Sequence, residues 1–144
     1  IVYYLGEQPK LNQVETFLCE NKVHRQHVIE NIAKLVVKPA NASGGYGIMI
    51  GPKAPKKERE EMVKKIKKNP REFVAQPLEI LSTIPTICEN GIEPRHLDLR
   101  PFILTGKTSY VTTGGLTRVA LRKGSTIVNS SQGGGSKDTM VVDA

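Results

Sequence analysis

Apolar positions along the chain form short runs separated by turns, and two stretches near the beginning have helical spacing. Apolar residues recur every three or four positions over residues 21–33 and again over 55–68, which predicts two amphipathic helices. Asn21 and Pro55 suit the starts of these helices, because an Asn side chain accepts from free backbone N–H groups and a proline has no N–H to leave unpaired. Residues 1–18 predict an irregular strap, and we expect its apolar side chains to cover the core.

A strand, a glycine-rich loop and a return strand are predicted over residues 35–50, between the two helices. The first apolar run ends in Lys38, and the loop that follows contains Gly44, Gly45 and Gly47. Glycine tolerates positive φ and lets backbone N–H groups approach a ligand closely, so this loop with a lysine at its base suits a polyphosphate. An ordinary hairpin turn is the alternative. The loop matches neither the P-loop nor the dinucleotide-binding pattern.

The remainder of the chain predicts strands joined by turns. Residues 73–80 form one of them, and Pro77 within it indicates an edge strand or the place where the chain leaves the sheet. A connection with a turn at Asn90-Gly91 then leads into an antiparallel run, which Gly114-Gly115 interrupts. We expect that run to comprise residues 96–104, 110–113, 116–121 and 125–128, with a second glycine-rich loop over 129–136. Helices and antiparallel strands without alternating βα units predict an α+β fold.

Charge and composition limit the classes of protein to which the chain can belong. The 144 residues are 38% hydrophobic, enough for a core, and the net charge is +7. Residues 53–71 hold nine Lys and Arg against three Glu, without interleaved aromatics, so we interpret them as a solvated helix face and expect no nucleic-acid partner. No apolar run approaches a membrane span and no leader opens the chain, which predicts a cytoplasmic protein without a membrane partner. Cys19 and Cys88 predict reduced thiols, and the abrupt apolar start predicts a fragment of a longer chain.

Candidate chemistry lies in the second half of the chain. Asp98 and Arg100 are two residues apart in a predicted strand, so they share a face, and Arg118 and Asn129 from following strands can converge on them. A carboxylate and an amide oxygen suit Mg²⁺, and two arginines suit a transferring phosphoryl group. A surface ion pair is the alternative for Asp98 and Arg100. After Asn129, a polar tract that includes Lys137 is either a site loop or an exposed linker.

Five ordered pieces of sequence together resemble a known family. They are Val-Val-Lys-Pro with Ser-Gly-Gly-Tyr-Gly (36–39, 43–47), Ala-Gln-Pro-Leu (75–78), Arg-His-Leu-Asp-Leu-Arg-Pro-Phe (95–102), Gly-Gly-Leu-Thr-Arg-Val-Ala-Leu (114–121) and Asn-Ser-Ser-Gln-Gly-Gly-Gly-Ser-Lys-Asp (129–138). The pattern resembles the ATP-grasp fold, and closely the circularly permuted ATP-grasp proteins of bacteria, which are related in pattern to glutathionylspermidine synthases. The resemblance covers nearly the whole chain. It implies two α+β subdomains, residues 1–80 and 81–144, whose antiparallel sheets clasp ATP between them.

The resemblance also implies roles for individual residues. The implied metal ligands for Mg²⁺ are Asp98 and Asn129, and the implied catalytic residues are Arg100 and Arg118. The implied ATP-binding residues are Lys38, the lid residues Ser43, Gly44, Gly45 and Gly47, the hinge residues Gln76, Leu78 and Glu79, and Lys137. One departure is Ile127, which stands where ATP-grasp enzymes usually carry a metal-binding Glu.

The activity that the resemblance implies is ATP-dependent ligation of a carboxylate to an amine through an acyl phosphate. The two substrates are not identified by the sequence. Because a metal ligand is replaced and further site residues are expected elsewhere in a longer chain, we expect the 144-residue fragment to be inactive alone. A nucleotide-binding module that regulates or scaffolds without turnover is the alternative.

Overall fold

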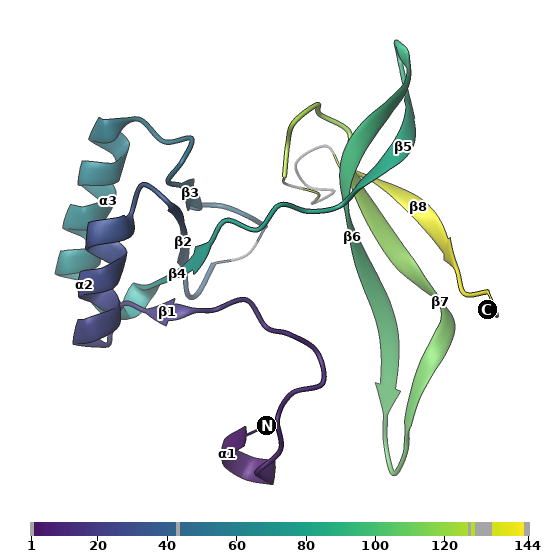
Figure 1. Cartoon of the computed structure of the whole chain (residues 1–144), viewed down its shortest axis with the longest axis horizontal. Coiled ribbons are helices and arrows are strands. Elements are labelled where there is room, and N and C mark those ends of the chain that lie inside the picture. The colour runs from purple at the N-terminus through teal and green to yellow at the C-terminus, as the bar shows by residue number, and fades with distance from the viewer. Residues whose placement is uncertain (1, 43, 127, 129–133, 143–144) are drawn as a thin grey trace. The chain divides into compact units, whose positions relative to one another are not determined.

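The computed structural model describes residues 2–42, 44–126, 128 and 134–142 (Figure 1). It divides into two compact units, Ile1–Leu78 and Glu79–Ala144, and each is described here by itself. Each unit contains one four-stranded sheet, and every strand pair is antiparallel. The predicted α+β class is therefore confirmed. No helix in the described part of the chain is long and apolar enough to cross a membrane.

The first unit packs two helices against a small sheet in the order β1-β4-β2-β3. Its elements are α1 (Val2–Leu5), β1 (Phe17–Leu18), α2 (Lys22–Asn31), β2 (Leu35–Pro39), β3 (Met49–Ile50), α3 (Lys56–Lys68), the 3₁₀ helix η1 (Pro70–Glu72) and β4 (Phe73–Pro77). The side chain of Asn21 caps α2 by accepting from the N–H groups of Val23 and His24 at 2.8 and 3.2 Å. Pro55 precedes α3. Both predicted helices and the predicted hairpin are confirmed.

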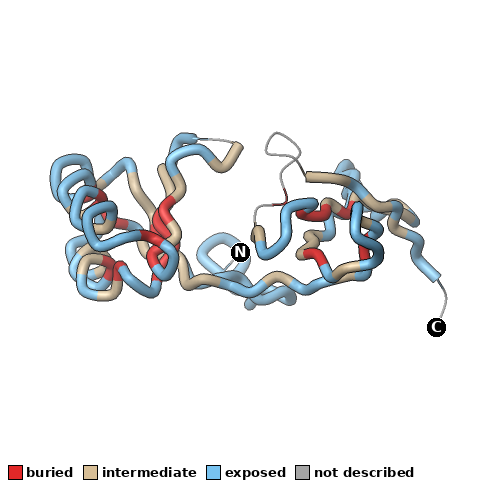
Figure 2. The backbone as a smooth tube through the Cα atoms, turned by 90° about the horizontal axis from the view of Figure 1, so that it is seen from above, coloured by how far each residue is buried: buried red, intermediate tan, exposed pale blue. Residues whose placement is uncertain are grey.

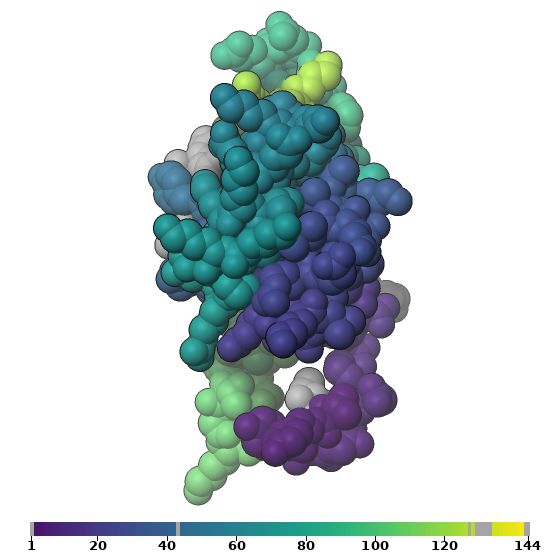
Figure 3. All heavy atoms as spheres, turned by 90° about the vertical axis from the view of Figure 1, so that its left-hand side faces the viewer, coloured from purple at the N-terminus to yellow at the C-terminus, as the bar shows by residue number. Residues whose placement is uncertain are grey.

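The core of this unit lies between the helices and one face of the sheet. Val37, Met49 and Ala75 from the strands are fully or almost fully buried, together with Val28 of α2 and Ile66 of α3. The two helices lie on the same side of the sheet in both ribbon views (Figures 1 and 2). Their outer surface is the face seen in Figure 3, and most of the charged residues of α3 are exposed. Because strand side chains alternate, the residues between the core positions point to the opposite face.

The second unit is a meander of four strands in the order β5-β6-β7-β8. The strands are β5 (Thr83–Cys88), β6 (Gly91–Thr105), β7 (Ser109–Ala120) and β8 (Gly134–Met140). Arg95, Thr117 and Val119 are buried, and the pairing register places them on one face of the sheet. Directly paired residues share a face, so Asp98 and Arg118 lie on the other.

Several predictions for the second unit are wrong. Residues 83–88 and the first residues of β6 form a hairpin rather than a connection, because β5 is an edge strand and tolerates Pro85. The interruption predicted at Gly114-Gly115 is confirmed in part: β7 is continuous, but its pairing with β6 shifts register beside these glycines. Pro101 pairs with Gly115 and Ile103 with Val111, so the extra residues lie on β7. Residues 125, 126 and 128 are not in a strand, and the end of the predicted glycine-rich loop begins β8.

In the first unit one expectation is wrong, and of two alternatives for Pro77 one is confirmed. The strap does not cover the core: Leu5, Leu11 and Val14 are 65%, 78% and 42% exposed, and Phe17 is the one described strap residue that packs against the core. Pro77 ends β4, which is an interior strand, so the chain leaves the sheet there.

Candidate functional site

Lys38 lies on the helix-free face of the first unit's sheet, near the end of β2. Its Nζ donates to Gln76 Oε1 on the neighbouring β4, at 2.5 Å, and Gln76 Nε2 donates to Thr16 Oγ1 at 2.8 Å. Lys38 and Gln76 are both half-buried. Gln76, itself held by Thr16, therefore holds the ammonium group of Lys38 in place, and the group keeps further N–H donors for an anion.

The glycine-rich loop joins β2 to β3, directly after this lysine. Gly44, Gly45 and Gly47 have φ of +69°, +79° and +72°, in the left-handed region that favours glycine. A Cβ at Gly47 would also lie 2.9 Å from Pro39 Cγ. The backbone therefore requires glycine here, as a loop that turns its N–H groups toward phosphate would, although its phosphate role stays a prediction. Ser43 lies outside the described residues.

Asp98, Arg100 and Arg118 lie together in the second unit. Asp98 Oδ2 accepts from Arg100 Nε at 3.1 Å and Nη2 at 3.0 Å, and Asp98 pairs across the strands with Arg118. The Oδ1 atom of Asp98 is buried and has no hydrogen-bond partner in the described structure. A hollow of about 280 Å³ beside Arg118 is lined by Gly134 and Ser136 of β8. The ion pair thus uses one carboxylate oxygen and leaves the other available.

The side chains of this cluster fit Mg²⁺ better than a metal ion that takes all of its ligands from the protein. Among the described residues, no three His, Cys, Asp or Glu side chains gather as metal ligands would. Mg²⁺ is usually held by one or two carboxylates together with substrate phosphates and waters, and an unpartnered buried carboxylate oxygen is what such a site requires. Asp98 is therefore a fitting ligand. The second predicted ligand, Asn129, lies outside the described residues.

The sequence profile of the family described as circularly permuted ATP-grasp type 2 matches residues 1–120. The chain belongs to this family. The resemblance drawn from the five sequence pieces is confirmed, and the two antiparallel sheets are those of an ATP-grasp fold.

The ATP-grasp relatives are longer proteins. An uncharacterized protein of Synechocystis sp. is 54% identical over 143 residues, which is 99% of this chain and 30% of the relative. One from Mycobacterium tuberculosis is 51% identical over 143 residues, 99% of this chain and 26% of the relative. A Frankia casuarinae protein named "Putative glutamate--cysteine ligase 2-2" is 46% identical over 141 residues, 98% of this chain and 16% of the relative. The chain thus spans less than a third of these relatives.

Three predicted ATP-binding residues remain among those that the structure describes, namely Lys137, Leu78 and Glu79. The register places Lys137 opposite Thr117, on the sheet face away from Asp98, and its Nζ donates to the carbonyl oxygen of Pro85 at 2.7 Å. Leu78 and Glu79 follow β4, and Glu79 is exposed. The binding roles of these three residues stay predictions.

Sequence reasoning missed Thr16 and Ser136. Thr16 lies in the irregular segment before β1, where no motif marks it, and its part is visible only from its contact with Gln76. Ser136 pairs with Arg118 across β7 and β8. It was predicted to lie in a loop, so nothing in the sequence pattern placed it opposite an arginine.

Proposed function

We propose that this chain is the ATP-binding part of an ATP-dependent carboxylate–amine ligase that works through an acyl phosphate. Membership of the ATP-grasp family and the ligase names of the Frankia relatives support an ATP-dependent ligase in general. The observation that carries the proposal is the free, buried Oδ1 of Asp98 beside Arg100 and Arg118. A structural ion pair needs no such oxygen, whereas a nucleotide-associated metal does.

In this proposal, residues of each unit act on the phosphates of ATP. The ammonium group of Lys38, held by Gln76, binds a phosphate oxygen, and the N–H groups of the glycine-rich loop cover the phosphates. Arg100 and Arg118 offset the charge on the transferring phosphoryl group. Bound Mg²⁺, held by Asp98 and Asn129, would neutralise phosphate charge.

The proposed ligation has two steps. A substrate carboxylate oxygen attacks the γ-phosphorus of ATP, and ADP leaves. The amine nitrogen of the second substrate then attacks the acyl carbon, loses a proton and displaces phosphate, which forms the amide. An acyl phosphate hydrolyses in water, so the proposal gives the glycine-rich loop a second task, which is to exclude water from it.

The binding part of this proposal is tested by titrating the chain with Mg²⁺ and ATP while following backbone amide shifts. We expect changes at Lys38, the glycine-rich loop, Asp98 and Arg118. Asp98→Asn should weaken ATP binding only when Mg²⁺ is present, because only metal coordination is lost. Asp138→Asn, at an exposed carboxylate on β8, is the matched control and should change little. Shifts confined to residues 53–71, or an equal loss with and without Mg²⁺, would contradict the proposal.

The catalytic part requires the full-length protein. We expect ADP release in the presence of a suitable carboxylate and amine, from a panel of amino acids and small amines, with the 144-residue chain inactive beside it. ATP binding without ADP release by the full-length protein under any pair would instead support a nucleotide-binding module.

A further inference from the structure

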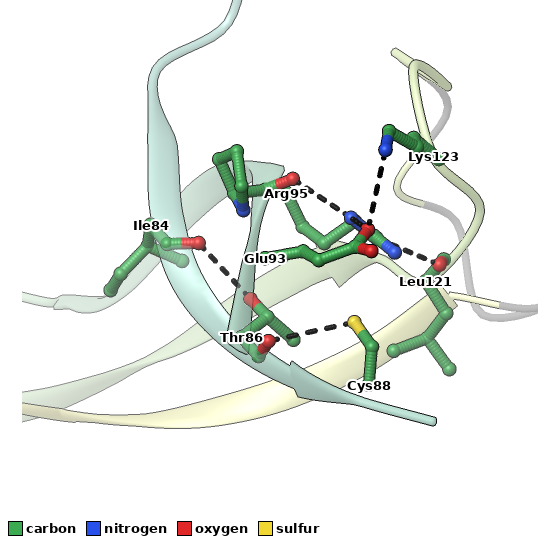
Figure 4. A network of polar contacts seen from close by, with 8 residues as sticks. Ile84, Thr86, Cys88, Glu93, Arg95, Leu121 and Lys123 are labelled. Carbon is green, nitrogen blue, oxygen red and sulfur yellow. Dashed lines mark hydrogen bonds and ion pairs between the residues drawn. The ribbon is translucent and has the colours of Figure 1, made fainter. Parts of the chain in front are cut away.

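A second polar site lies in the second unit, away from the Asp98 cluster. Around the β5–β6 hairpin, a half-open hollow of about 630 Å³ is lined by Arg95 and Glu93 of β6 and by Lys123 (Figure 4). Arg95 lies three positions before Asp98 in a regularly paired stretch of β6, so the two side chains leave opposite faces of the sheet. The hollow is therefore not part of the proposed ATP site.

Arg95 is the buried group of this hollow. It is 6% exposed, its Nε donates to the carbonyl oxygen of Leu121 at 3.0 Å, and its Nη1 donates to the carbonyl oxygen of Pro94 at 3.0 Å and lies 2.7 Å from Glu93 Oε2. Arg95 lines the hollow, and no buried atom of its side chain lacks a hydrogen-bond partner in the described structure. A guanidinium held in place by two carbonyl oxygens and a carboxylate is fixed in position to bind a ligand carboxylate.

The carboxylates of the hollow balance its cations. Glu93 Oε2 is shared between Arg95 and the ammonium group of Lys123, which lies 3.9 Å away. The hydrogen bond from Arg95, followed by the charge of Lys123, lowers the pKa of Glu93, so it is ionised at neutral pH. Glu89 adds a second carboxylate, and Ile87 and Leu121 add apolar surface. Two positive and two negative groups thus surround a partly apolar space.

We propose that this hollow binds a zwitterion of the α-amino acid class, either a free amino acid or a dipeptide. The ligand carboxylate accepts from Arg95 Nη2 and Lys123, the ligand ammonium faces Glu93 Oε1 and Glu89, and the ligand side chain contacts Leu121. A phosphate or another simple anion is disfavoured, because it would meet two carboxylates as well as two cations. The volume lies within the range of about 300–1,000 Å³ that small-molecule sites have.

The test is a titration of the chain, without ATP or Mg²⁺, with leucine and with leucyl-leucine, followed by amide shifts. Isoamylamine and 4-methylpentanoate, which each keep one charge of leucine, are the matched ligands. We expect saturable shifts at residues 87–95 and 121–123 with one or both zwitterions, and binding at least about tenfold weaker for either single-charge analogue, since each lacks one charge-assisted contact. Which zwitterion binds more tightly distinguishes amino acid from dipeptide.

Variants make the test specific. Lys123→Ala removes an 82% exposed side chain that the fold does not need, and we expect it to weaken binding about threefold to tenfold. Lys107→Ala, in the exposed β6–β7 turn, is the control and should leave binding unchanged. Arg95→Gln should abolish binding but risks unfolding, so Lys123→Ala carries the test. No shifts at about 10 mM of either zwitterion, equal binding of a single-charge analogue, or shifts at Lys38 and Asp98 instead would overturn the proposal.

Discussion

Replacing Gln76 by leucine tests whether the amide of Gln76 fixes Lys38. The substitution keeps the side chain's approximate size and removes both hydrogen bonds, the one from Lys38 Nζ at 2.5 Å and the one to Thr16 Oγ1 at 2.8 Å. This contact exists without any nucleotide. Its strength can therefore be measured as stability of the first unit, independently of the proposed ligase activity.

The expected magnitude follows from the charge and the exposure of the pair. A hydrogen bond to a charged group contributes about 1.5–3 kcal/mol when it is buried. Lys38 and Gln76 are only half-buried, and solvent screening reduces the contribution to about 1 kcal/mol. The bond to Thr16 is exposed and neutral, so Thr16→Val should cost about 0.5 kcal/mol.

A double-mutant cycle with Lys38→Met and Gln76→Leu isolates the pair. Urea unfolding followed by far-ultraviolet circular dichroism reports on the first unit, because every helix of the described chain lies in it. We expect a coupling energy of about 1 kcal/mol between Lys38 and Gln76. Thr16→Val combined with Lys38→Met is the control cycle, and its coupling should be smaller, because these two side chains meet only through Gln76.

A coupling energy below about 0.5 kcal/mol for the first cycle would refute the reasoning, because independent sites add within that margin. Lys38 would then be free to move in the absence of ligand. The claim that the unliganded protein holds its phosphate-binding cation in place would have to be withdrawn, even if ATP binds.

Three further outcomes can be checked. Gly51→Ala should lower the free energy of unfolding by at least about 2 kcal/mol in urea, because its Cβ would lie 1.9 and 2.6 Å from two carbonyl oxygens; unchanged stability would contradict this. Ellman's reagent should label half-buried Cys88 in the folded chain but Cys19 only in denaturant, since burial raises the pKa of the Cys19 thiol; equal rates would show otherwise. Arg95 lowers the pKa of Glu93 in the folded chain, so ionised Glu93 stabilises the fold at a pH above its unfolded-state pKa of about 4.3. This stabilisation is lost as the pH falls through the folded-state pKa. The urea midpoint of Glu93→Gln should therefore change less with pH over this acidic range, and an unchanged pH profile would contradict the prediction.

Local signals explain what the sequence could predict. The cap at Asn21, the helical spacing and the glycines after Lys38 each act within a few residues, so the two helices, the hairpin and its loop could be placed. The contact of Thr16 with Gln76 spans 60 residues and depends on how β1 and β4 pair, and no pattern within either segment encodes that. The β5–β6 hairpin was missed because prolines, which usually break a strand, lie on both of its strands.

The candidate site depends on strand register, which a sequence pattern leaves open by one residue. Lys137 was predicted beside the phosphate residues, yet the pairing of β7 with β8 sets it opposite Thr117 and sets its neighbour Ser136 opposite Arg118. A shift of this pairing by one residue would move Lys137 to the face that carries Arg118. The same alternation of side chains puts Arg95 and Asp98 on opposite faces of β6.

In a strand with one polar face, the charged residues occupy alternate positions, so their residue numbers are all odd or all even. Glu93 and Arg95 are odd and Asp98 and Arg100 are even, so the charges of β6 change face within one strand. The change leaves a charged group on each face: the buried guanidinium of Arg95 on one, and on the other Asp98, whose buried Oδ1 has no hydrogen-bond partner among the described residues. Burying either without a ligand costs free energy that a purely structural strand would avoid by placing apolar residues there. Binding on both faces of one strand accounts for both charged groups, whereas an ATP site alone accounts only for Asp98.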